Sequence, residues 1–442
     1  MTRAPGRLPA RSAGHYNRGL FKRGLPVRRR SAADEALPAR RHYSMRYFAH
    51  VVGHCDVRLW SLSADERIRR QLAQAGDVTL AERLDEVPGD AHVLLLRADF
   101  LYEVRTLKSL LERPGAVLTH GDGTPAAAHA KPGQAESLRA ALAGEASIPG
   151  DVDVVVPDQL GAFDHQLRKA KPPLLEPVTA DRRGALESLL YGTSYKGITD
   201  LVTKFLWPRP ARVVVGWCAR LGLTPNMVTG FSFFLMLAVC WLFANGHFGL
   251  GLAAGWLMTF LDTVDGKLAR VTIMSSRFGH VLDHGMDLIH PPFWYYYWGV
   301  GLAAYQPLLG LELTDLYWLI IAGYIGGRAF EGMFHGLGDA SIFSWRPFDA
   351  YFRLITGRRN PCMILLTAGV LAGRPDWGLV GVALWTAGTT AVLAARLLHG
   401  AAVRIVSGPL TSWLADPETA ATRHARAYRT FSGTQSAYVD RG

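Results

Sequence analysis

The sequence predicts an α-helical polytopic membrane domain with six transmembrane helices, preceded by a soluble α/β domain. Three observations support this fold class. From Thr224 onward the chain runs through long apolar stretches, most of them close to the ~20 residues that a helix needs to cross a bilayer. Before residue 205, charged residues are scattered throughout, which is typical of a soluble domain. At 442 residues the chain is also too long for one average domain.

Residues 1–45 form a basic leader for which we expect no folded structure. They hold ten Arg and one Lys against two acidic residues, so their net charge of +9 accounts for most of the chain's +11. The leader has no apolar periodicity and lacks the apolar core of a secretory signal. It is interpreted as a solvated tail or as the product of an upstream start codon, with Met45 beginning the folded protein. A transit peptide or an anchor on anionic lipid is the alternative.

Residues 46–180 are predicted to form the soluble α/β domain. Residues 91–99 and 153–157 are apolar runs typical of buried strands, and residues 64–75 and 106–111 have helical patterns. Alternating strands and helices favour the α/β class. The four cysteines of the chain lie far apart, so neither a zinc site nor a disulfide framework is expected.

A linker follows, residues 181–223, whose last part is expected to lie at a membrane interface as an amphipathic helix. Trp207 and Trp217 stand there among three arginines, a combination that suits the boundary between lipid and water. Thr224 and Pro225 then predict the start of the first membrane helix, because Thr is a good N-cap and Pro suits the first helical position.

The membrane domain is predicted to cover residues 224–405, with a cytoplasmic tail over residues 406–442. Its six candidate helices are residues 225–244, 248–270, 280–305, 315–336, 360–373 and 376–400. Alternate connections are rich in Arg and Lys, and the positive-inside rule places those connections and both termini in the cytoplasm. We therefore expect a multi-pass protein of the inner cell membrane.

Four aspartates stand within the second and third of these helices, inside the expected membrane. The segment reads Asp262-x2-Asp265-Gly266-x2-Ala269-Arg270-x8-Gly279-x3-Asp283-x3-Asp287. A carboxylate at bilayer depth costs about 3 kcal/mol on insertion scales, so four of them predict a compensating cation. At ~100° per residue the two acids of each pair share a helical face, and residues 274–279 are expected to turn the chain between the pairs. Oxygen-only ligands favour a hard ion such as Mg²⁺ or Mn²⁺. A proton or cation path through a transporter is the alternative.

This segment resembles the signature of the CDP-alcohol phosphotransferase family and matches all eight of its fixed positions. Members of that family are integral membrane enzymes that displace CMP from a CDP-linked donor with an alcohol. The resemblance implies that Asp262, Asp265, Asp283 and Asp287 hold Mg²⁺ or Mn²⁺, with two ions expected. It also implies that Asp287 activates the acceptor hydroxyl as the catalytic residue.

The same resemblance implies a site for the CDP group. Gly266, Ala269 and Gly279 would let this group approach the backbone closely, Arg270 would lie near phosphate, and Asn226 either faces the diphosphate or caps and packs. The donor would be CDP-diacylglycerol or a CDP-polyol, and the acceptor an alcohol or a polyol phosphate. Contact with membrane lipid and a homodimer are expected from the family, and no nucleic-acid partner is expected.

Arginines near the later helices are candidates for acceptor binding. Arg328 lies within the fourth predicted helix and Arg353 on the cytoplasmic side, and a guanidinium binds phosphate well. The alternative for Arg328 is an internal pair with Glu331 or a site aspartate. Arg358 and Arg359 are expected to be ordinary positive-inside charge.

The soluble half bears a weaker likeness to sugar-phosphate nucleotidyltransferases, which are fused to such membrane domains in enzymes that make di-myo-inositol phosphate phosphate. The likeness covers residues 52–76 and 95–102, and in it Asp99 would occupy a metal-binding position. Residues 1–60 contain no Gly-rich basic loop of the kind that cradles a triphosphate. We therefore interpret residues 46–180 as a degenerate domain for packing, regulation or dimer support, and a bifunctional cytidylyltransferase/phosphotransferase is the alternative.

Overall fold

The computed structural model describes residues 47–160, 163–164, 169–170, 173–274, 277–302 and 305–432. Within these ranges, side chains are described except at residues 163, 164, 169, 170, 277, 278, 280–284 and 287. The predicted leader lies outside the described residues, as do residues 433–442 of the predicted tail. The chain divides after Ser44, and the unit that begins at Met45 contains every element below.

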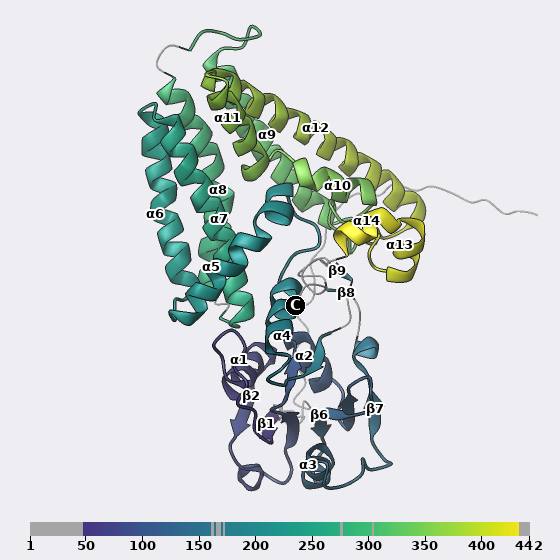
Figure 1. Ribbon diagram of the computed structural model, residues 1–442. Coiled ribbons are helices and arrows are strands. Elements are labelled where there is room, and N and C mark those ends of the chain that lie inside the picture. Colours follow the sequence, from purple (N-terminus) through teal and green to yellow (C-terminus); the bar gives the residue numbers. More distant parts are fainter. Residues whose placement is uncertain are drawn as a thin grey trace, which may run out of the picture. The chain divides into compact units, whose positions relative to one another are not determined.

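A six-stranded mixed sheet forms the centre of the α/β domain, with strand order β2-β1-β3-β6-β5-β7 (Figure 1). β1 is parallel to β2 and β3, β6 is antiparallel to β3 and β5, and β7 is parallel to β5. The strands are β1 (Tyr47–Val52), β2 (Val78–Ala81), β3 (His92–Arg97), β5 (Ala116–Thr119), β6 (Pro125–Ala130) and β7 (Asp153–Val155). The predicted α/β class of this domain is confirmed, with β3 and β7 inside the predicted strand segments.

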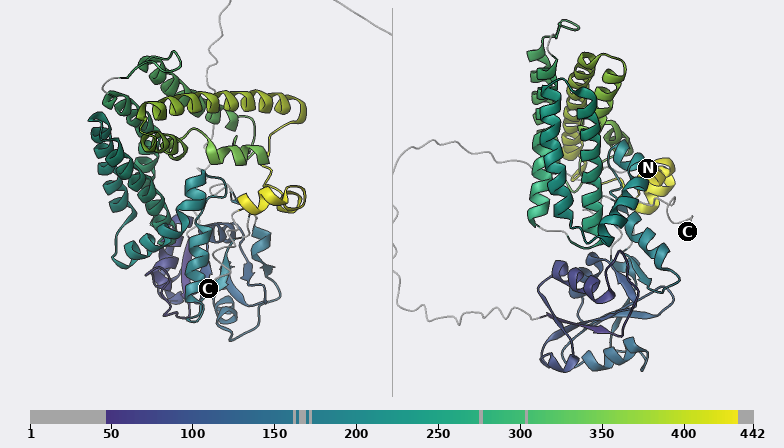
Figure 2. Two further views of the ribbon diagram at one scale, coloured as in Figure 1. Left: turned by 45° about the horizontal axis from the view of Figure 1, so that its top comes forward. Right: turned by 60° about the vertical axis from the view of Figure 1, so that its left-hand side comes forward.

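Helices cover both faces of the sheet, as Figure 2 shows in its right-hand view. They are α1 (Ala64–Ala75), α2 (Val104–Leu111) and α3 (Ala135–Ala143). Leu94 and Leu96 of β3 pack in one cluster with α1 and α2, and Val93 and Leu95 pack in another with α3. A strand buried on both faces reads as a continuous apolar run, which is why the sequence identified it. The helices predicted at 64–75 and 106–111 are confirmed as α1 and α2.

Shorter elements extend the domain and lead out of it. They are β4 (Phe100–Tyr102), β8 (Phe163–Asp164), β9 (Lys169–Ala170), β10 (Leu175–Pro177), the 3₁₀ turns η1 (Leu84–Glu86) and η2 (Pro157–Leu160), α4 (Arg183–Thr193), the π-helical turn η3 (Val202–Leu206) and α5 (Pro208–Arg220). α5 is the helix predicted before the membrane domain. It buries Ala211 and Val215 while Trp217 is exposed, as expected for an amphipathic helix.

The remaining chain is helical. Its helices are α6 (Pro225–Ala244), α7 (Phe248–Val271), α8 (Arg277–Gly301), α9 (Leu313–His335), α10 (Pro347–Ile355), α11 (Arg359–Leu371), α12 (Pro375–Ser407), α13 (Pro417–Arg423) and α14 (Ala425–Phe431). α6, α7 and α8 run side by side, and α12 packs along α9 and α11 (Figure 1). Thr224 caps α6 by accepting a hydrogen bond from the Met227 amide, and Pro225 occupies the first position, as predicted.

Two predicted boundaries are wrong. The turn expected over residues 274–279 lies earlier in the chain, because α7 ends at Val271, Ile273 has a positive φ of 53°, and α8 already begins at Arg277. Gly279 therefore lies in the first turn of α8. The last long helix, expected over residues 376–400, continues to Ser407 because its apolar pattern ends only at Gly408.

Among the described residues, α6 and α12 are long and apolar enough to cross a membrane, judged by length and composition. α7 is not among them, and it carries Asp262, Asp265, Lys267 and Arg270 near its end. The six-span topology stays a prediction. One face of α6 carries large apolar side chains that are exposed at helical spacing, as lipid-facing residues are. These are Met227, Phe231, Phe234, Leu237 and Trp241.

A buried ion pair joins α10 to α12. Asp349 is 2% exposed and accepts hydrogen bonds from Arg396 at 2.6 and 2.8 Å and from the Arg346 amide at 3.1 Å. Replacing Arg396 with Met leaves this carboxylate buried without its cation, so we expect a loss of about 3–5 kcal/mol of stability. The measurement is the thermal unfolding midpoint of the detergent-purified protein.

The matched control is Arg404→Met, which changes an exposed arginine on the same helix. The double variant Asp349→Leu/Arg396→Met should recover most of the loss, because it removes both charges together. Equal midpoints for Arg396→Met and Arg404→Met would show that the pair does not stabilise the fold.

Candidate functional site

A polar cavity of about 580 Å³ lies between α7, α8, the later helices α9 to α11 and the segment over residues 195–203. α7 contributes Asp262, Gly266 and Arg270, and the predicted acceptor arginines Arg328 and Arg353 line the same cavity. The other lining residues are Tyr195, Lys196, Ile198, Thr199, Asp200, Thr203, Thr263, Lys267, Gly285, Leu288, Pro291, Glu331, Arg358, Arg359, Asn360 and Pro361. Residues that are far apart in the sequence are thus gathered around the motif helix.

The two aspartates of α7 have different environments. Asp262 forms an ion pair with Arg359 of α11, and both side chains are largely buried. Asp265 is 3% exposed, and one of its oxygens accepts a hydrogen bond of 2.6 Å from Thr229 Oγ1 of α6. Asp262 therefore faces the cavity, while Asp265 links α7 to α6.

Gly266 and Arg270 lie one turn apart on α7. A Cβ built on Gly266 would come within 3.1 Å of the Arg270 guanidinium, which is tighter than most such contacts. The absence of a side chain at Gly266 thus leaves the Arg270 guanidinium room to lie along the helix beside the cavity. The resemblance implied a different role, in which Gly266 lets the CDP group approach the backbone and Arg270 lies near phosphate, and that role stays a prediction.

The other predicted site residues are placed as follows. Asp283 and Asp287 lie on α8, and their side chains are outside the described residues. Gly279 is half-buried in the first turn of α8, and Ala269 is half-buried on α7. Asn226 is exposed at the start of α6 and does not line the cavity. The roles proposed for these residues stay predictions.

Glu331 of α9 is shared by two arginines. Arg328 lies 3.7 Å from its carboxylate, and Arg358 forms a closer pair with the same oxygen. The internal pair that the sequence offered as the alternative for Arg328 therefore exists. Because one carboxylate faces two guanidinium groups, positive charge is left over at this side of the cavity.

Asp200 is a further carboxylate in the lining of this cavity. It is 8% exposed and accepts hydrogen bonds from the Val202 and Thr203 amides at 3.1 and 3.0 Å and from Asn360 Nδ2 at 3.0 Å. Burial opposes the ionised form, but Arg353 and these donors outweigh it and hold the pKa of Asp200 below its ordinary value. Asp200 is thus an ionised anchor that links η3 to α11.

The described lining of the cavity is strongly basic. It holds seven Lys and Arg side chains against three carboxylates, those of Asp200, Asp262 and Glu331. The ammonium group of Lys267 is held by other contacts: it donates a hydrogen bond to the Ser194 carbonyl at 3.1 Å and lies over the Tyr195 ring. Such a surplus of guanidinium groups suits anionic ligands, above all phosphate groups.

Arg358 and Arg359, which the sequence indicated as ordinary positive-inside charge, line the cavity and pair with its carboxylates. Asp200, Lys196 and Asn360 were not singled out as site residues. Their signal in the sequence is weak, because each is a single polar residue remote from the motif. Only the fold brings them together.

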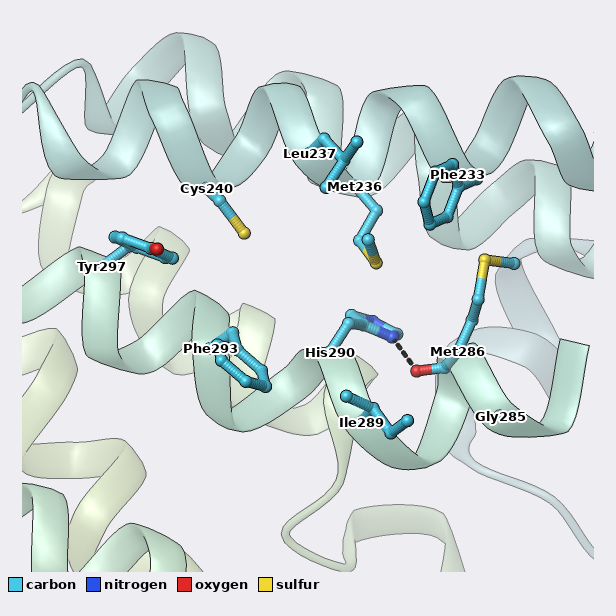
Figure 3. Close-up of a pocket in the computed structure, with 10 residues that line it drawn as sticks. All are labelled: Phe233, Met236, Leu237, Cys240, Gly285, Met286, Ile289, His290, Phe293 and Tyr297. Carbon is cyan, nitrogen blue, oxygen red and sulfur yellow. Dashed lines mark hydrogen bonds between the residues drawn. The ribbon is translucent and has the colours of Figure 1, made fainter. Parts of the chain in front are cut away.

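A second, apolar cavity of about 560 Å³ lies between α6 and α8. In Figure 3 the side chains of Cys240, Met236 and Phe233 point toward Phe293, His290 and Met286 across this space. His290 is held by a hydrogen bond of 2.6 Å between its Nδ1 and the Met286 carbonyl. Gly285 of α8 lines both cavities. The polar cavity and the apolar cavity therefore meet at Gly285, which has no side chain to separate them.

The segment that contains the aspartate motif also matches a known protein family. Residues 222–327, which span α6 to α8 and much of α9, match a protein-family model described as CDP-alcohol phosphatidyltransferase. The C-terminal region of the chain thus contains a CDP-alcohol phosphatidyltransferase domain.

A similar curated protein is the phosphatidylinositol phosphate synthase of Mycobacteroides abscessus, which is 39% identical over 71 residues. The similarity covers 16% of this chain and 32% of the relative, so the chain spans about a third of that protein's length. The α/β domain lies outside the residues that the family model matches.

Proposed function

We propose that the protein is a membrane CDP-alcohol phosphotransferase that moves the phosphatidyl group of CDP-diacylglycerol to the hydroxyl of a phosphorylated polyol and releases CMP. The observation that carries the proposal is that Asp262, Gly266 and Arg270 of the eight-position motif line a basic cavity, which shares Gly285 with an apolar cavity. The matched family supports phosphatidyl transfer as the reaction class.

A divalent cation, Mg²⁺ or Mn²⁺ with two ions expected, is part of this proposal. Asp262 and Asp265 stand on neighbouring turns of α7 and would supply carboxylate oxygens, the donor chemistry that such ions prefer, with Asp265 doing so while it accepts the hydrogen bond from Thr229. The described residues contain no group of three His, Cys, Asp or Glu that would hold a metal by themselves. Asp283 and Asp287 would complete the ligand set from α8. When bound, the ions would neutralise the diphosphate and stabilise the departing CMP.

The residues of the chain would then act in the following way. Arg270 and Gly266 would hold the diphosphate against α7, and Asp287 would accept the proton of the acceptor hydroxyl. The acceptor oxygen forms a bond to the phosphorus that carries the diacylglycerol. The bond from that phosphorus to the bridging oxygen breaks, and this oxygen leaves with its electron pair as part of CMP.

The basic side of the cavity supports a phosphorylated acceptor. Arg328 and Arg353 line it together with Arg358, where Glu331 is shared by Arg328 and Arg358 and Asp200 interacts with Arg353. A phosphate on the acceptor would bind these guanidinium groups in a bidentate manner. The relative from M. abscessus is named as a phosphatidylinositol phosphate synthase, which is consistent with a phosphorylated polyol as substrate or product.

The apolar cavity supports a lipid donor over a water-soluble CDP-polyol. Because Gly285 lines both compartments, a diphosphate at Gly266 would place its attached acyl chain beside Met286 and Cys240. Cys240→Trp should fill part of this space, so we expect kcat/KM for CDP-diacylglycerol to fall by roughly tenfold or more. The measurement is CMP release at varied donor concentration, together with the affinity for CDP itself, which should stay unchanged.

Ala238→Trp is the matched control. It introduces the same side chain two residues earlier on α6, at an exposed position that does not line the apolar cavity. Equal kcat/KM values for the two variants would remove the apolar cavity from the donor site. Faster turnover of CDP-inositol than of CDP-diacylglycerol by the unmodified protein would contradict the lipid donor.

The remaining expectations stay part of the proposal. We propose an inner-membrane, multi-pass location with cytoplasmic termini, contact with membrane lipid and a homodimer, and no nucleic-acid partner. A bifunctional enzyme that also makes its own CDP-linked donor is the second candidate. Against it, Asp99 is engaged by Arg97 in an ion pair of 2.6 Å.

A further inference from the structure

The α/β domain contacts the end of the motif helix through one face of α1. Arg70 Nη1 donates to the Thr272 carbonyl at 2.7 Å, Arg67 Nη2 to the Val271 carbonyl at 3.3 Å and Gln74 Nε2 to the Ile273 carbonyl at 3.4 Å. The spacing of three and four residues places these three side chains on one side of α1. Three successive carbonyls at the end of α7 thus receive donors from another part of the chain.

These carbonyls are the ones that need outside donors. The last carbonyl groups of a helix have no intrahelical partner and carry partial negative charge, so arginine is favourable there. Ile273, which follows the helix, has a φ of 53°, a left-handed conformation that a β-branched residue rarely adopts unless its surroundings impose it. Gln74 contacts this residue. α1 therefore stabilises a backbone conformation that the local sequence does not favour.

Arg67 is itself firmly placed. It is 5% exposed, and the same nitrogen also donates to the Leu59 carbonyl at 2.8 Å. Beside it, Trp60 packs in one apolar cluster with Tyr191, Val264 and Leu268. Apolar packing therefore accompanies the hydrogen bonds between α1 and the end of α7.

The segment held by α1 joins the two halves of the aspartate motif. α7 carries Asp262 and Asp265 and ends at Val271, and α8 begins at Arg277 and carries Asp283 and Asp287. The path of the short connection sets how the start of α8 lies against α7. A shift of about 1 Å between groups that act together can lower a rate by ~10²-fold.

We propose that Arg67, Arg70 and Gln74 are positioning residues, through which the α/β domain fixes the α7–α8 connection and holds the two halves of the motif at the separation that phosphoryl transfer needs. The α/β domain is then a required part of the phosphotransferase site. This inference rests on the function proposed above.

The test compares Arg70→Ala with Arg69→Ala in the full-length protein, purified in detergent. Arg69 is exposed on the same helix and is the matched control. The first measurement is hydrogen–deuterium exchange of peptides that cover residues 268–280. The second is CMP release from CDP-diacylglycerol, with kcat, KM and the Mg²⁺ concentration for half-maximal rate determined separately.

For Arg70→Ala we expect exchange at residues 271–279 to rise and kcat to fall, each roughly tenfold, with the KM for the donor within about threefold of the unmodified value. The Mg²⁺ requirement should rise, because the aspartates of the two helices would no longer be held together. Arg70→Lys should restore part of the rate, since Lys retains a cationic donor. Arg69→Ala should match the unmodified protein in every measurement.

Two results would overturn the inference. One is exchange in Arg70→Ala equal to that in Arg69→Ala, and the other is faster exchange with unchanged kcat. If the unmodified protein releases CMP from no donor, the proposed function fails by itself. The inference is then decided by whether Arg70→Ala weakens Mg²⁺-dependent binding of CDP more than Arg69→Ala does, and equal binding would overturn it.

Discussion

Replacing Asp287 with asparagine is expected to lower kcat for CMP release by about 10²–10⁴-fold, the usual contribution of a positioned general base. Asparagine keeps the size of the side chain but cannot accept the proton of the acceptor hydroxyl. The affinity for CDP should change little, because the other three aspartates would still hold the cation. The measurement pairs steady-state kinetics with calorimetric binding of CDP in the presence of Mg²⁺.

The result separates the two roles assigned to Asp287. A large loss of kcat with intact CDP binding supports its role as the base. Loss of CDP binding together with kcat would instead make Asp287 mainly a metal ligand. Turnover equal to that of the unmodified protein would exclude it from the reaction.

Asp262→Asn is expected to weaken metal and nucleotide binding together and to abolish most turnover. Asp262 is paired with Arg359, so the substitution removes the carboxylate of that ion pair as well as a proposed metal ligand. The Mg²⁺ concentration for half-maximal rate and the dissociation constant of CDP should each rise by roughly 10–100-fold. Both are measured on the same purified variant, by titration of metal and of nucleotide.

Asp376→Asn is a suitable control, since this aspartate pairs with Arg374 at the start of α12 and does not line the polar cavity. Its kinetics and its CDP affinity should match those of the unmodified protein. An Asp262→Asn variant that binds CDP normally and needs no additional Mg²⁺ would contradict the role of Asp262 as a ligand.

Local signals in the sequence predicted several elements accurately. The helix over Ala64–Ala75 has the predicted limits because Ser63 caps it and Gly76 ends it. Thr224 and Pro225 likewise mark the start of α6. β3 was identifiable because its four central residues, Val93 to Leu96, are apolar and buried on both faces of the sheet. Each of these features is decided by residues that are near one another in the chain.

The polar cavity could be predicted only in part, for a different physical reason. Asp262, Gly266 and Arg270 share a helix, so their spacing alone places them together. Arg359 and Asp200 reach the same cavity only through the packing of α11 and η3, which no local pattern encodes. The end of α7 also accepts hydrogen bonds from Arg67, Arg70 and Gln74 of α1, contacts that no local pattern indicates.

The most direct test of the central claim is CMP release by the detergent-purified protein with Mg²⁺ or Mn²⁺. CDP-diacylglycerol and CDP-inositol would each be offered with a panel of polyols and polyol phosphates. We predict metal-dependent CMP release with CDP-diacylglycerol and a polyol phosphate, lost in Asp262→Asn. Failure to release CMP with any pair, together with no metal-dependent binding of CDP, would contradict the account.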